Sequence, residues 1–494
     1  MINKPVVTYE AFGAVGNGVA DDLPSICAAH EYANAHGLPV QTKGDAIYHL
    51  GRRALTAKIA TDTDWNTSRF TIDDRDVEDH ACNLFLVPPT HELLDFQISR
   101  LSKDQTQLPA SPDVDCYVYV ENDQQLRFLR KGLNQSKGTP QHDSFVLRND
   151  GSISSPIDWD YDTITRMEVR PLEEKTLRIQ GGIFTTVANC MHQEVGYTYW
   201  ARNILITRSN TVVDGMTHYV VGETDVGHPY GGFLETEKCV GITFQNCFFS
   251  GHKTYTTIGV LNEPVSMGSY DVLANDVVNF SLLNCSMHHI LDRSHWGVIG
   301  TNFCKNILLE GCTLSRMDTH MGVSGGYTIR DCTLGHMGLN AIGRGKLVVE
   351  NSTLYGFALI NFRQDYGSIW DGEVLIKNCK WIPSCGEEAA PRMFCVVNDG
   401  LHDFGYACSM PERVRVDGLT VDDRNHPEGY EGMLYFTDPD GDGKDVLEEV
   451  RPFPYQKCKE LRVRGVTCLS GKAPQVCRDS ALLEAVSFVD EDAV

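Results

Sequence analysis

Ile307-Leu-Leu-Glu-Gly311-Cys312 and, twenty residues later, Tyr327-Thr-Ile-Arg-Asp331-Cys332 are the stretches that decide how this chain folds. In both, an apolar strand runs into Gly, Asp or Asn and then a small residue. A unit of roughly 20 to 30 residues that carries one strand and one turn cannot bury its apolar face alone, so copies must stack. The other copies read Ile242-Thr-Phe-Gln-Asn246-Cys247, Phe280-Ser-Leu-Leu-Asn284-Cys285, Leu347-Val-Val-Glu-Asn351-Ser352 and Val374-Leu-Ile-Lys-Asn378-Cys379.

Stacked units of this kind predict an all-β chain folded as a right-handed parallel β-helix. Each coil of such a solenoid places the same residue at the same height on the same wall. A column of Cys would then fill the interior, and a column of Asn at the turn would bond its neighbours. Five of the 17 Cys recur at this strand position, which is typical of buried, reduced thiols rather than of a disulfide framework.

Changes in this pattern divide the chain into four segments. We expect an N-terminal capping helix after Asp21 and Asp22, because apolar residues follow at helical spacing until Gly37. The regular coils break off near residue 84 and resume near residue 177. The expected segments are 1–83 for the cap and first coils, 84–176 for a β-rich insertion or small lobe, 177–470 for the β-helix that carries the site, and 471–494 for the tail.

The entry to that helix carries a family resemblance. Residues 12–22, Phe-Gly-Ala-Val-Gly-Asn-Gly-Val-Ala-Asp-Asp, resemble the motif Phe-Gly-Ala-x-Gly-Asp-Gly-x-x-Asp-Asp of pectate-lyase-like and polygalacturonase-like β-helix enzymes, with Asn17 in place of Asp. The resemblance implies β-helix architecture for most of residues 1–470. It implies no single reaction, because this fold hosts hydrolases, lyases, epimerases and adhesins. The Asn-Thr-Asp and Asp-Asp signatures of the polygalacturonases are absent at the expected coils, and Gly335-His336-Met-Gly338 matches their Gly-His-Gly only in part.

Composition narrows the expected partners. A formal charge of −23 argues against nucleic acid and anionic membranes as partners, and no run of eighteen apolar residues is present. The first residues lack the apolar segment of a signal peptide, which predicts a cytoplasmic location. We expect an oligosaccharide or polysaccharide as partner, and a homo-oligomer, either dimer or trimer, stays open.

Ionisable side chains gather in the segments that follow the Cys positions. Aligning His-Trp-Gly-Val with His-Met-Gly-Val places His295 above His320 and brings Asp292 beside Asp318, at about 4.8 Å per coil. Two neighbouring carboxyls can divide general-acid and general-base roles. The predicted catalytic residues are Asp292, Asp318, His320, His295, Arg363 and Asp365.

A wider set of residues is expected to bind the substrate. His252, Tyr255 and Tyr230 would stack on sugar rings at one end of a groove, with Tyr366 and Asp371 at the other. Column neighbours complete the set: Arg293, His336, Asn340, Arg344 and Asn361. The alternative for each residue is a structural role at a coil corner or on a solvated wall.

One acidic loop matches the calcium pattern D-x-D-x-D-G with Glu at position twelve. Its ligands would be Asp438, Asp440, Asp442 and Glu449, although Asp445 stands where an apolar residue is usual. The alternative is an acidic turn that binds nothing. No cofactor is expected to be required, and a calcium ion here would be structural.

These observations predict a carbohydrate-active enzyme that cleaves or rearranges glycosidic bonds through paired carboxylates, as a glycoside hydrolase or transglycosidase. A polysaccharide lyase or uronate epimerase is the first alternative, with arginines that neutralise the acid group of the sugar. A glycan-binding β-helix without catalysis is the second. The density of Asp, His and Arg on successive coils argues against the last.

Overall fold

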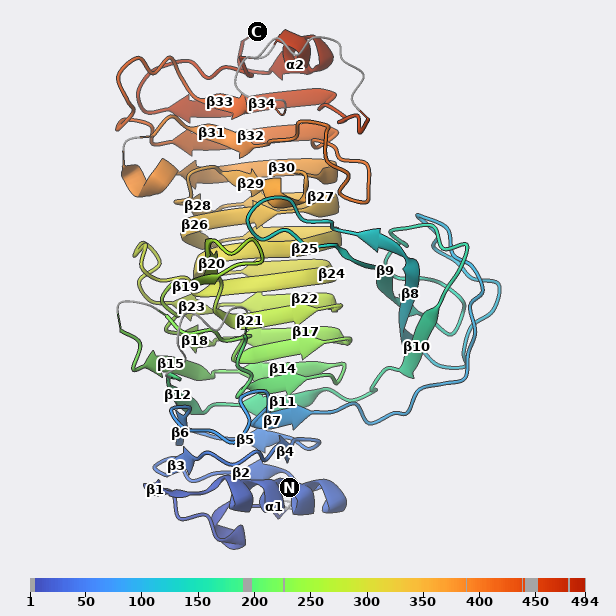
Figure 1. The fold of residues 1–494 in the computed structure, drawn as a ribbon, viewed down its shortest axis with the longest axis vertical. Helices are drawn as coiled ribbons and strands as arrows, with labels where there is room; N and C mark the ends of the chain where they lie inside the picture. The colour runs from blue at the N-terminus through green and yellow to red at the C-terminus, as the bar shows by residue number, and fades with distance from the viewer. Residues whose placement is uncertain are drawn as a thin grey trace.

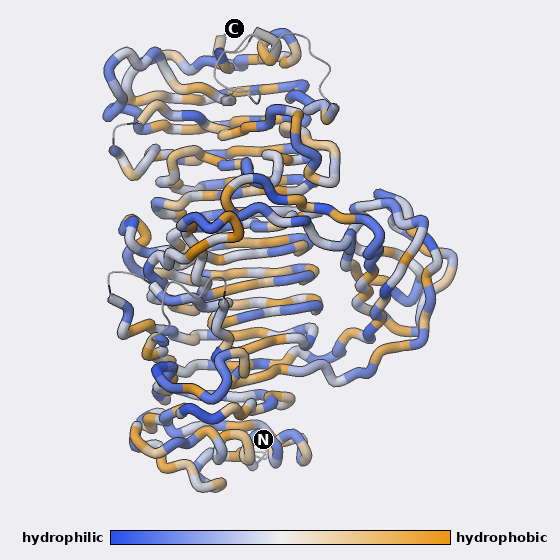
Figure 2. The backbone as a smooth tube through the Cα atoms, viewed as in Figure 1, coloured by the Kyte–Doolittle hydropathy of each residue, from blue (hydrophilic) through white to orange (hydrophobic). Residues whose placement is uncertain are grey.

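The structure, a computed structural model, describes residues 5–189, 198–224, 227–387, 389–437, 439, 452–478 and 480–493. Within them, 30 strands form one sheet whose neighbours pair in parallel and whose coils stack from one end of the molecule to the other (Figure 1). The chain therefore folds as the right-handed parallel β-helix that the repeats predict. Apolar and polar positions alternate along the coils, as Figure 2 shows.

The first coils contain short strands and a capping helix. Helix α1 (Leu23–His36) begins after Asp22, whose carboxylate accepts hydrogen bonds from Val15 N at 2.6 Å and Gly16 N at 3.2 Å, and so closes the entry turn. Its buried face packs on the core and caps the first coil. No described helix has the length and apolarity needed to cross a membrane. The strands are β1 (Asn17–Asp21), β2 (Val40–Gln41), β3 (Ile47–Leu50), β4 (Ala57–Lys58), β5 (Thr63–Asp64), β6 (Arg69–Asp73) and β7 (Phe85–Val87).

The central coils carry the repeat, and its copies stack in register as predicted. Ile242 pairs with Phe280, Phe280 with Ile307 and Ile307 with Tyr327. The strands here are β11 (Leu177–Gln180), β12 (Ile183–Val187), β13 (Ile204–Ile206), β14 (Thr211–Asp214), β15 (Thr217–Val221), β16 (Leu234–Glu237), β17 (Val240–Gln245), β18 (Phe248–Phe249), β21 (Tyr270–Asn275), β22 (Val278–Leu283), β23 (Ser286–Met287), β24 (Val298–Glu310), β25 (Thr313–Arg330), β26 (Thr333–Ala341), β27 (Gly343–Glu350), β28 (Thr353–Leu354), β29 (Ile360–Phe362), β30 (Trp370–Trp381) and β31 (Arg392–Cys395). A hairpin of β19 (Tyr255–Ile258) and β20 (Pro264–Met267) projects from them.

The turn column explains the recurring Asn and Gly. Asn246, Asn284 and Gly311 have φ of 54°, 53° and 66°, the left-handed region that Asn and Gly tolerate best. The Nδ2 of Asn246 donates to the Asp214 carboxylate one coil away at 2.8 Å. The turn residues thus close each coil and link it to its neighbour, as expected.

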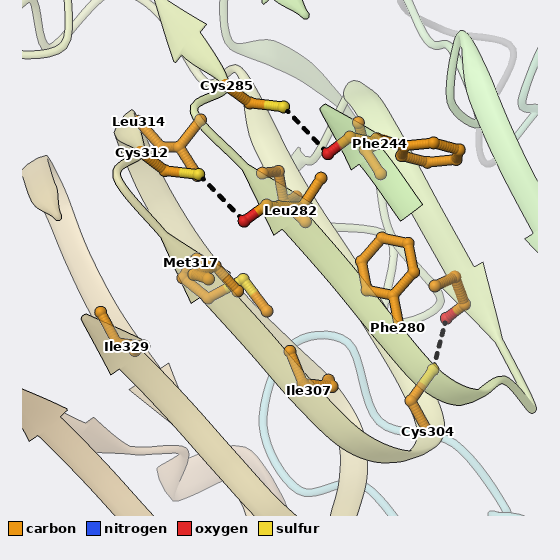
Figure 3. Close-up of a cluster of buried hydrophobic side chains, with 14 of the residues drawn as sticks. Phe244, Phe280, Leu282, Cys285, Cys304, Ile307, Cys312, Leu314, Met317 and Ile329 are labelled. Carbon is orange, nitrogen blue, oxygen red and sulfur yellow. Dashed lines mark hydrogen bonds between the residues drawn. The ribbon is translucent and has the colours of Figure 1, made fainter. Parts of the chain in front are cut away.

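The Cys column lies inside the solenoid. The thiol of Cys285 donates to Phe244 O at 3.4 Å, and that of Cys312 donates to Leu282 O at 3.3 Å, as Figure 3 shows. All Cys among the described residues are free thiols. This bears out the prediction of reduced thiols that act as small core residues.

The insertion begins later than expected. Strand β7 pairs with β4 and β13, so the helix extends to Val87 instead of ending at residue 83. The insertion is an antiparallel sheet of β8 (Cys116–Arg127), β9 (Thr139–Leu147) and β10 (Arg166–Pro171), with its own apolar core. It stands beside the solenoid, and the β8–β9 connection, residues 128–138, lies across the coils (Figure 1). We call this connection the strap.

The last coils are β32 (Arg413–Val421), β33 (Leu434–Phe436), β34 (Glu460–Cys468) and β35 (Ser487–Asp490), with the short helix α2 (Ser480–Ala485). Strand β35 pairs in parallel with β34. The segment expected as a tail after residue 470 therefore contributes one more strand to the helix.

Candidate functional site

One wall of the helix carries a column of outward-facing polar residues. In register, Gly300 stands beside Asp318, Asp318 beside Asn340, and Asn340 beside Asn361. Leu273 and Glu235 precede Gly300 on earlier coils. Asp318 therefore lies in the middle of a continuous column, which runs on its C-terminal side through Asn340 and Asn361 to Cys395.

The predicted register of this column is wrong: aligning His295 with His320 assumes an interval of 25 residues, whereas Gly300 and Asp318 pair at an interval of 18. Gly300, and not Asp292, lies beside Asp318, and β24 begins only at Val298, after His295. The reason is that Asp292 and His295 belong to the turn before β24 and pair with no residue of β25. Further along the two strands, Thr301 pairs with Thr319 but Asn302 pairs with Met321, so His320 is an extra residue in β25 and the register shifts again there. A repeat of twenty residues that holds at the Cys positions does not hold on this wall.

Asp318 is the centre of a buried ion cluster. Its carboxylate lies 3.0 Å from Arg363 Nη1 through both oxygens and 2.9 Å from Arg316 Nη2, and the residue is 2% exposed. Burial would raise the pKa of Asp318, but Arg316 and Arg363 outweigh burial and hold the pKa below its usual value. The carboxylate is therefore ionised at neutral pH.

A second carboxylate and a third arginine extend this cluster. Arg363 donates Nε and Nη2 to Asp365 at 3.1 and 2.8 Å, and Arg130 donates Nε to Asp365 at 2.8 Å. Burial raises the pKa of Asp365, but Arg363 and Arg130 bring it down to about 2. Arg130 comes from the strap, 235 residues earlier in the chain, and sequence reasoning missed it. We call Asp318, Asp365, Arg130, Arg316 and Arg363 the wall cluster.

His320 has the chemistry of a neutral base. Its Nδ1 donates to Asn302 Oδ1 at 3.1 Å, and the Asn302 amide is oriented by donating Nδ2 to Asn275 Oδ1 at 2.6 Å. The proton therefore sits on Nδ1 and leaves Nε2 as the basic nitrogen. Burial first, and then Arg363, lowers the pKa of His320 to about 3, so the ring is uncharged at neutral pH.

Aromatic rings flank the wall cluster. The Tyr270 ring covers Gly300, where a Cβ would come within 3.0 Å of it, and burial together with the Asp318 charge raises the Tyr270 pKa. Arg316 stacks on the Trp296 ring at 5.0 Å from its centroid. Sequence reasoning did not select Tyr270 or Trp296, because neither stands at a repeated position.

The other predicted residues around this column divide into two groups. Asn340 and Asn361 belong to the column, and their amides lie 2.5 Å apart. Tyr366 lies beneath Arg130 and Arg363 at 5.3 and 5.6 Å and is 2% exposed, so its ring faces are covered by protein. It supports the wall cluster and cannot stack on a sugar, contrary to expectation.

The turn before β24 holds three predicted residues away from the wall cluster, and a fourth, His336 of β26, contacts this turn. Asp292 accepts from Ser294 N at 2.9 Å and lies 3.1 Å from His295 Nδ1, while Arg293 pairs with Glu387 at 2.9 Å. The hydrogen bonds from Ser294 lower the pKa of Asp292. His336 Nδ1 contacts the backbone oxygen of Ile290 at 3.0 Å. The structure therefore does not bring Asp292 and Asp318 together as an acid–base pair.

The upstream aromatic group is buried. Tyr230 donates its hydroxyl to Asp74 at 3.1 Å, and His252 lies 3.1 Å from Glu223. Tyr230, His252 and Tyr255 are 5%, 1% and 0% exposed. Their predicted stacking on sugar rings is wrong, because these side chains pack the corners of the coils.

Arg344 and Asp371 lie outside the wall cluster, in a cleft of about 480 Å³ between the insertion and the coils. Arg344 Nη1 is 3.2 Å from the Asp158 carboxylate of the insertion, and Asp371 is 3.1 Å from Lys103 Nζ. Arg344 and Asp371 are register neighbours on β27 and β30. The two predicted residues therefore sit together, but at a second place.

The predicted calcium ligands Asp438, Asp440, Asp442 and Glu449 lie outside the described residues. In the part of the chain that the structure describes, no three His, Cys, Asp or Glu side chains converge as a metal site requires. The calcium loop stays a prediction.

Comparisons with known proteins concern the fold and one short stretch. No family model matches the chain. Over 94 residues it is 34% identical to a KL64-specific capsule depolymerase of Klebsiella phage P510, and this stretch is 17% of the chain and 9% of the depolymerase. The chain thus matches less than a tenth of that protein's length.

Two solved structures are similar over nearly the whole chain. The Gp54 tailspike of Acinetobacter baumannii bacteriophage AP22, solved with an A. baumannii capsular saccharide, matches 98% of this chain and 79% of its own, with a TM-score of 0.52 and 11% identity. The gp49 tailspike of Pseudomonas phage LKA1 matches 98% and 84%, with a TM-score of 0.47 and 11% identity. The AP22 likeness supports the β-helix fold that the motif at residues 12–22 implies. The predicted cytoplasmic location gains no support from it and stays a prediction.

Proposed function

We propose that this protein is a carbohydrate-active enzyme that cleaves a polysaccharide at the wall cluster. The observation that carries the proposal is the buried, ionised Asp318 held between Arg316 and Arg363 on the outer wall. Burying an ion pair costs desolvation energy, so a buried ion pair is weak evidence that the charges stabilise the fold. The strands of this wall can pair without these charges, and we therefore take the charges as the mark of a functional site. The depolymerase is similar to a short stretch of this chain, and the saccharide-bound tailspike is similar to its fold. Both similarities support a capsular polysaccharide as the substrate class.

The residues of the wall cluster favour elimination or epimerisation over hydrolysis by paired carboxyls. Hydrolysis of that kind needs a carboxyl with a raised pKa as the acid, and the pKa values of Asp318 and Asp365 are both lowered. Glu235 has a pKa raised by burial, but it stands three strands from Asp318 in the column. At about 4.8 Å per strand this is about 14 Å, beyond the roughly 6.5–9.5 Å of inverting enzymes.

Elimination removes the proton next to a uronate carboxylate and expels the oxygen at the neighbouring carbon. Arg130, Arg316 and Arg363 outnumber Asp318 and Asp365 by one charge, which would neutralise the uronate. His320 Nε2 is unprotonated and would take the proton; its low pKa makes it a weak base, and the uronate carboxylate would raise that pKa by offsetting the charge of Arg363. The Tyr270 phenol, kept protonated by its raised pKa, would supply a proton to the leaving oxygen.

Hydrolysis is the second candidate. Asp318 and Asp365 both accept hydrogen bonds from the guanidinium of Arg363. An ionised carboxylate of this kind can act as a nucleophile. In that case the acid would come from the substrate or from outside the wall cluster. A dimer or trimer, which would bring a neighbouring protomer to this wall, stays a prediction.

The test is a product screen on capsular and uronic-acid polysaccharides that follows new reducing ends and the ultraviolet absorbance of an unsaturated sugar together. Reducing ends with absorbance support elimination, and reducing ends alone support hydrolysis. His320→Gln should abolish elimination and spare hydrolysis, whereas Asp292→Asn on the preceding turn serves as the control and should change neither. Absence of cleavage with every polysaccharide would overturn the proposal.

A further inference from the structure

The cleft between the insertion and the coils is a separate feature from the wall cluster. Trp159 and Asp158 from the insertion face Arg344 and Ser324 from the helix across about 480 Å³, which is within the size range of small-molecule sites. Phe128 stands between the two places: it lines the cleft, and its ring packs against Tyr366 of the wall at 6.1 Å. A polymer that crosses the coils could therefore touch both.

The lining of the cleft combines aromatic rings with groups that bind hydroxyls. The rings of Trp159 and Tyr406 lie 6.1 Å apart at 33°, and both side chains are partly exposed. Arg127 covers one face of Trp159 at 4.7 Å and is itself fixed by Gln141 at 2.9 Å. Apolar ring faces beside fixed polar groups match the two kinds of surface that a sugar ring presents.

One polar atom in the cleft lacks a partner. The hydroxyl of Ser324 is buried, with the residue 5% exposed, and finds no hydrogen-bond partner among the described residues. A buried hydroxyl without a partner costs about 1–3 kcal/mol, so such atoms call for an explanation. A ligand hydroxyl in the cleft would satisfy it.

The charges of the cleft select the kind of sugar. Its lining has five carboxylates, Asp143, Asp158, Asp160, Asp162 and Asp371, against three cations, Lys103, Arg127 and Arg344. Several are locked together: Arg344 pairs with Asp158 at 3.2 Å, and the buried Lys305 behind the lining pairs with Asp143 at 2.6 Å. Asp371 pairs with Lys103 at 3.1 Å and Asp162 with Arg100 at 2.6 Å, which leaves Asp160 against Arg127. The cleft therefore has no excess positive charge to bind a uronate, unlike the wall cluster.

We propose that this cleft is a second saccharide-binding site, which takes a neutral or amino sugar of the same polymer whose acidic sugar is bound at the wall cluster. The inference rests on the proposed function in taking a polysaccharide as the ligand. It adds that the repeat unit alternates in charge and that the insertion, not the helix alone, sets specificity.

The test blocks the mouth of the cleft without touching the wall cluster. Ala407 is exposed and lines the cleft, so Ala407→Trp fills it, and Ser324→Ala removes the unpartnered hydroxyl with little change in volume. Ala110→Trp, at an exposed alanine of the insertion outside the lining, is the matched control. The full chain carrying Asp318→Asn, which should not cleave, is titrated with neutral, amino-sugar and uronate oligosaccharides of defined length.

We expect Ala407→Trp to weaken binding of neutral or amino-sugar oligosaccharides at least about tenfold, which is about 1.4 kcal/mol. Ser324→Ala should weaken this binding less, and Ala110→Trp should leave it unchanged. Equal binding in all three variants, or no binding of any probe, would overturn the inference. So would a loss confined to uronates. If the wild type cleaves a polysaccharide and Ala407→Trp leaves the KM for it unchanged, the proposed enzyme function stands and the proposed second binding site is wrong. If nothing is cleaved but the blocked cleft still loses binding, the cleft stands and the proposed enzyme fails.

Discussion

At the scale of single residues, replacing Asp318 with Asn should affect both turnover and stability. The change leaves Arg316 and Arg363 buried without their shared counter-charge, and breaking a buried pair in this way costs about 3–5 kcal/mol. The sequence alone predicts a loss of only a few degrees in melting temperature, because a wall carboxylate would be exposed. The 2% exposure of Asp318 overturns that expectation. We expect turnover to fall at least about 100-fold, measured by initial rates below the melting temperature.

Loss of stability has to be separated from loss of function. Asp74 and Arg202 form another fully buried pair, at 2.9 Å, on earlier coils. Asp74→Asn should lower the melting temperature by a similar amount and leave the rate per folded molecule unchanged. Equal activity of the two variants would assign Asp318 a structural role.

Acid should weaken the N-terminal cap through His30. This side chain is fully buried, Tyr9 OH lies 2.8 Å from its Nε2, and burial lowers its pKa to about 3 from 6.5. Below pH 6.5 the unfolded chain binds a proton that the folded chain does not, so stability falls as the pH falls from 6.5 towards 3. At 1.36 kcal/mol per pH unit the loss at pH 5 is about 2 kcal/mol.

His30→Gln keeps an acceptor for Tyr9 but does not titrate, which makes it the variant to compare. Between pH 7 and pH 5 the free energy of unfolding of the wild type, obtained from urea midpoints, should fall by about 2 kcal/mol more than that of the variant. Parallel pH profiles for the two proteins would mean that His30 is protonated in the folded state.

Sequence reasoning located part of the wall cluster and could not have located the rest. Asp318, Arg363 and Asp365 follow repeated strand–turn phrases, so their density on successive coils indicated a site. Arg130 lies in a polar stretch without any repeat, and only the fold of the insertion brings it to Asp365. A contact across 235 residues leaves no periodic trace in the sequence.

At the scale of the coil, the turn column can be tested with two glycines in equivalent places. Gly215 and Gly311 have φ of 69° and 66°, but a Cβ at Gly215 would meet nothing within 4 Å, whereas one at Gly311 would lie 2.4 Å from Asn284 Oδ1. Gly215→Ala should cost about 1–2 kcal/mol through backbone strain alone. Gly311→Ala should cost about 1–3 kcal/mol more, because the Asn284 side chain must leave its place.

Thermal melts of the two variants give the difference directly. Equal melting temperatures would show that Asn284 moves aside without cost and that the turn ladder contributes little. A melting temperature lower for Gly215→Ala than for Gly311→Ala would contradict the stacking argument itself.

The coils also show which features of the strands and turns can be predicted from the sequence. Strand positions and turn residues recur because every coil meets the same steric demand, a narrow interior and a left-handed turn. The wall between those points has no such demand, so one extra residue at His320 was invisible in a fixed period of twenty. The predicted pair of Asp292 and Asp318 failed because Asp292 lies in the turn before β24, and Gly300 is the register partner of Asp318.

At the scale of the whole molecule, the segment expected as a β-rich insertion or small lobe contributes to the wall through the strap. Leu129 N donates to Phe404 O at 3.1 Å, Lys131 N donates to Asp365 O at 2.9 Å, and Lys131 Nζ pairs with Asp399 at 2.6 Å. These bonds join a segment near residue 130 to coils formed by residues after 360 in the sequence. The strap therefore couples two distant parts of the chain at the wall cluster.

Replacing residues 129–131 of the strap with Gly-Ser-Gly should separate the fold from its function. The parallel ladders of the helix do not pass through the strap, so the main melting transition should shift by no more than a few degrees. Asp365 would lose Arg130, the wall cluster would lose its excess positive charge, and we expect kcat/KM to fall at least about tenfold, about 1.4 kcal/mol in transition-state stabilisation. The control replaces residues 133–135, in the middle of the same strap where Leu133 and Gln135 are exposed, with the same tripeptide, and should retain full activity. Hydrogen exchange at residues 363–366 gives the structural readout: faster exchange is expected only when residues 129–131 are changed, and unchanged exchange together with full activity would show that the strap merely covers the wall.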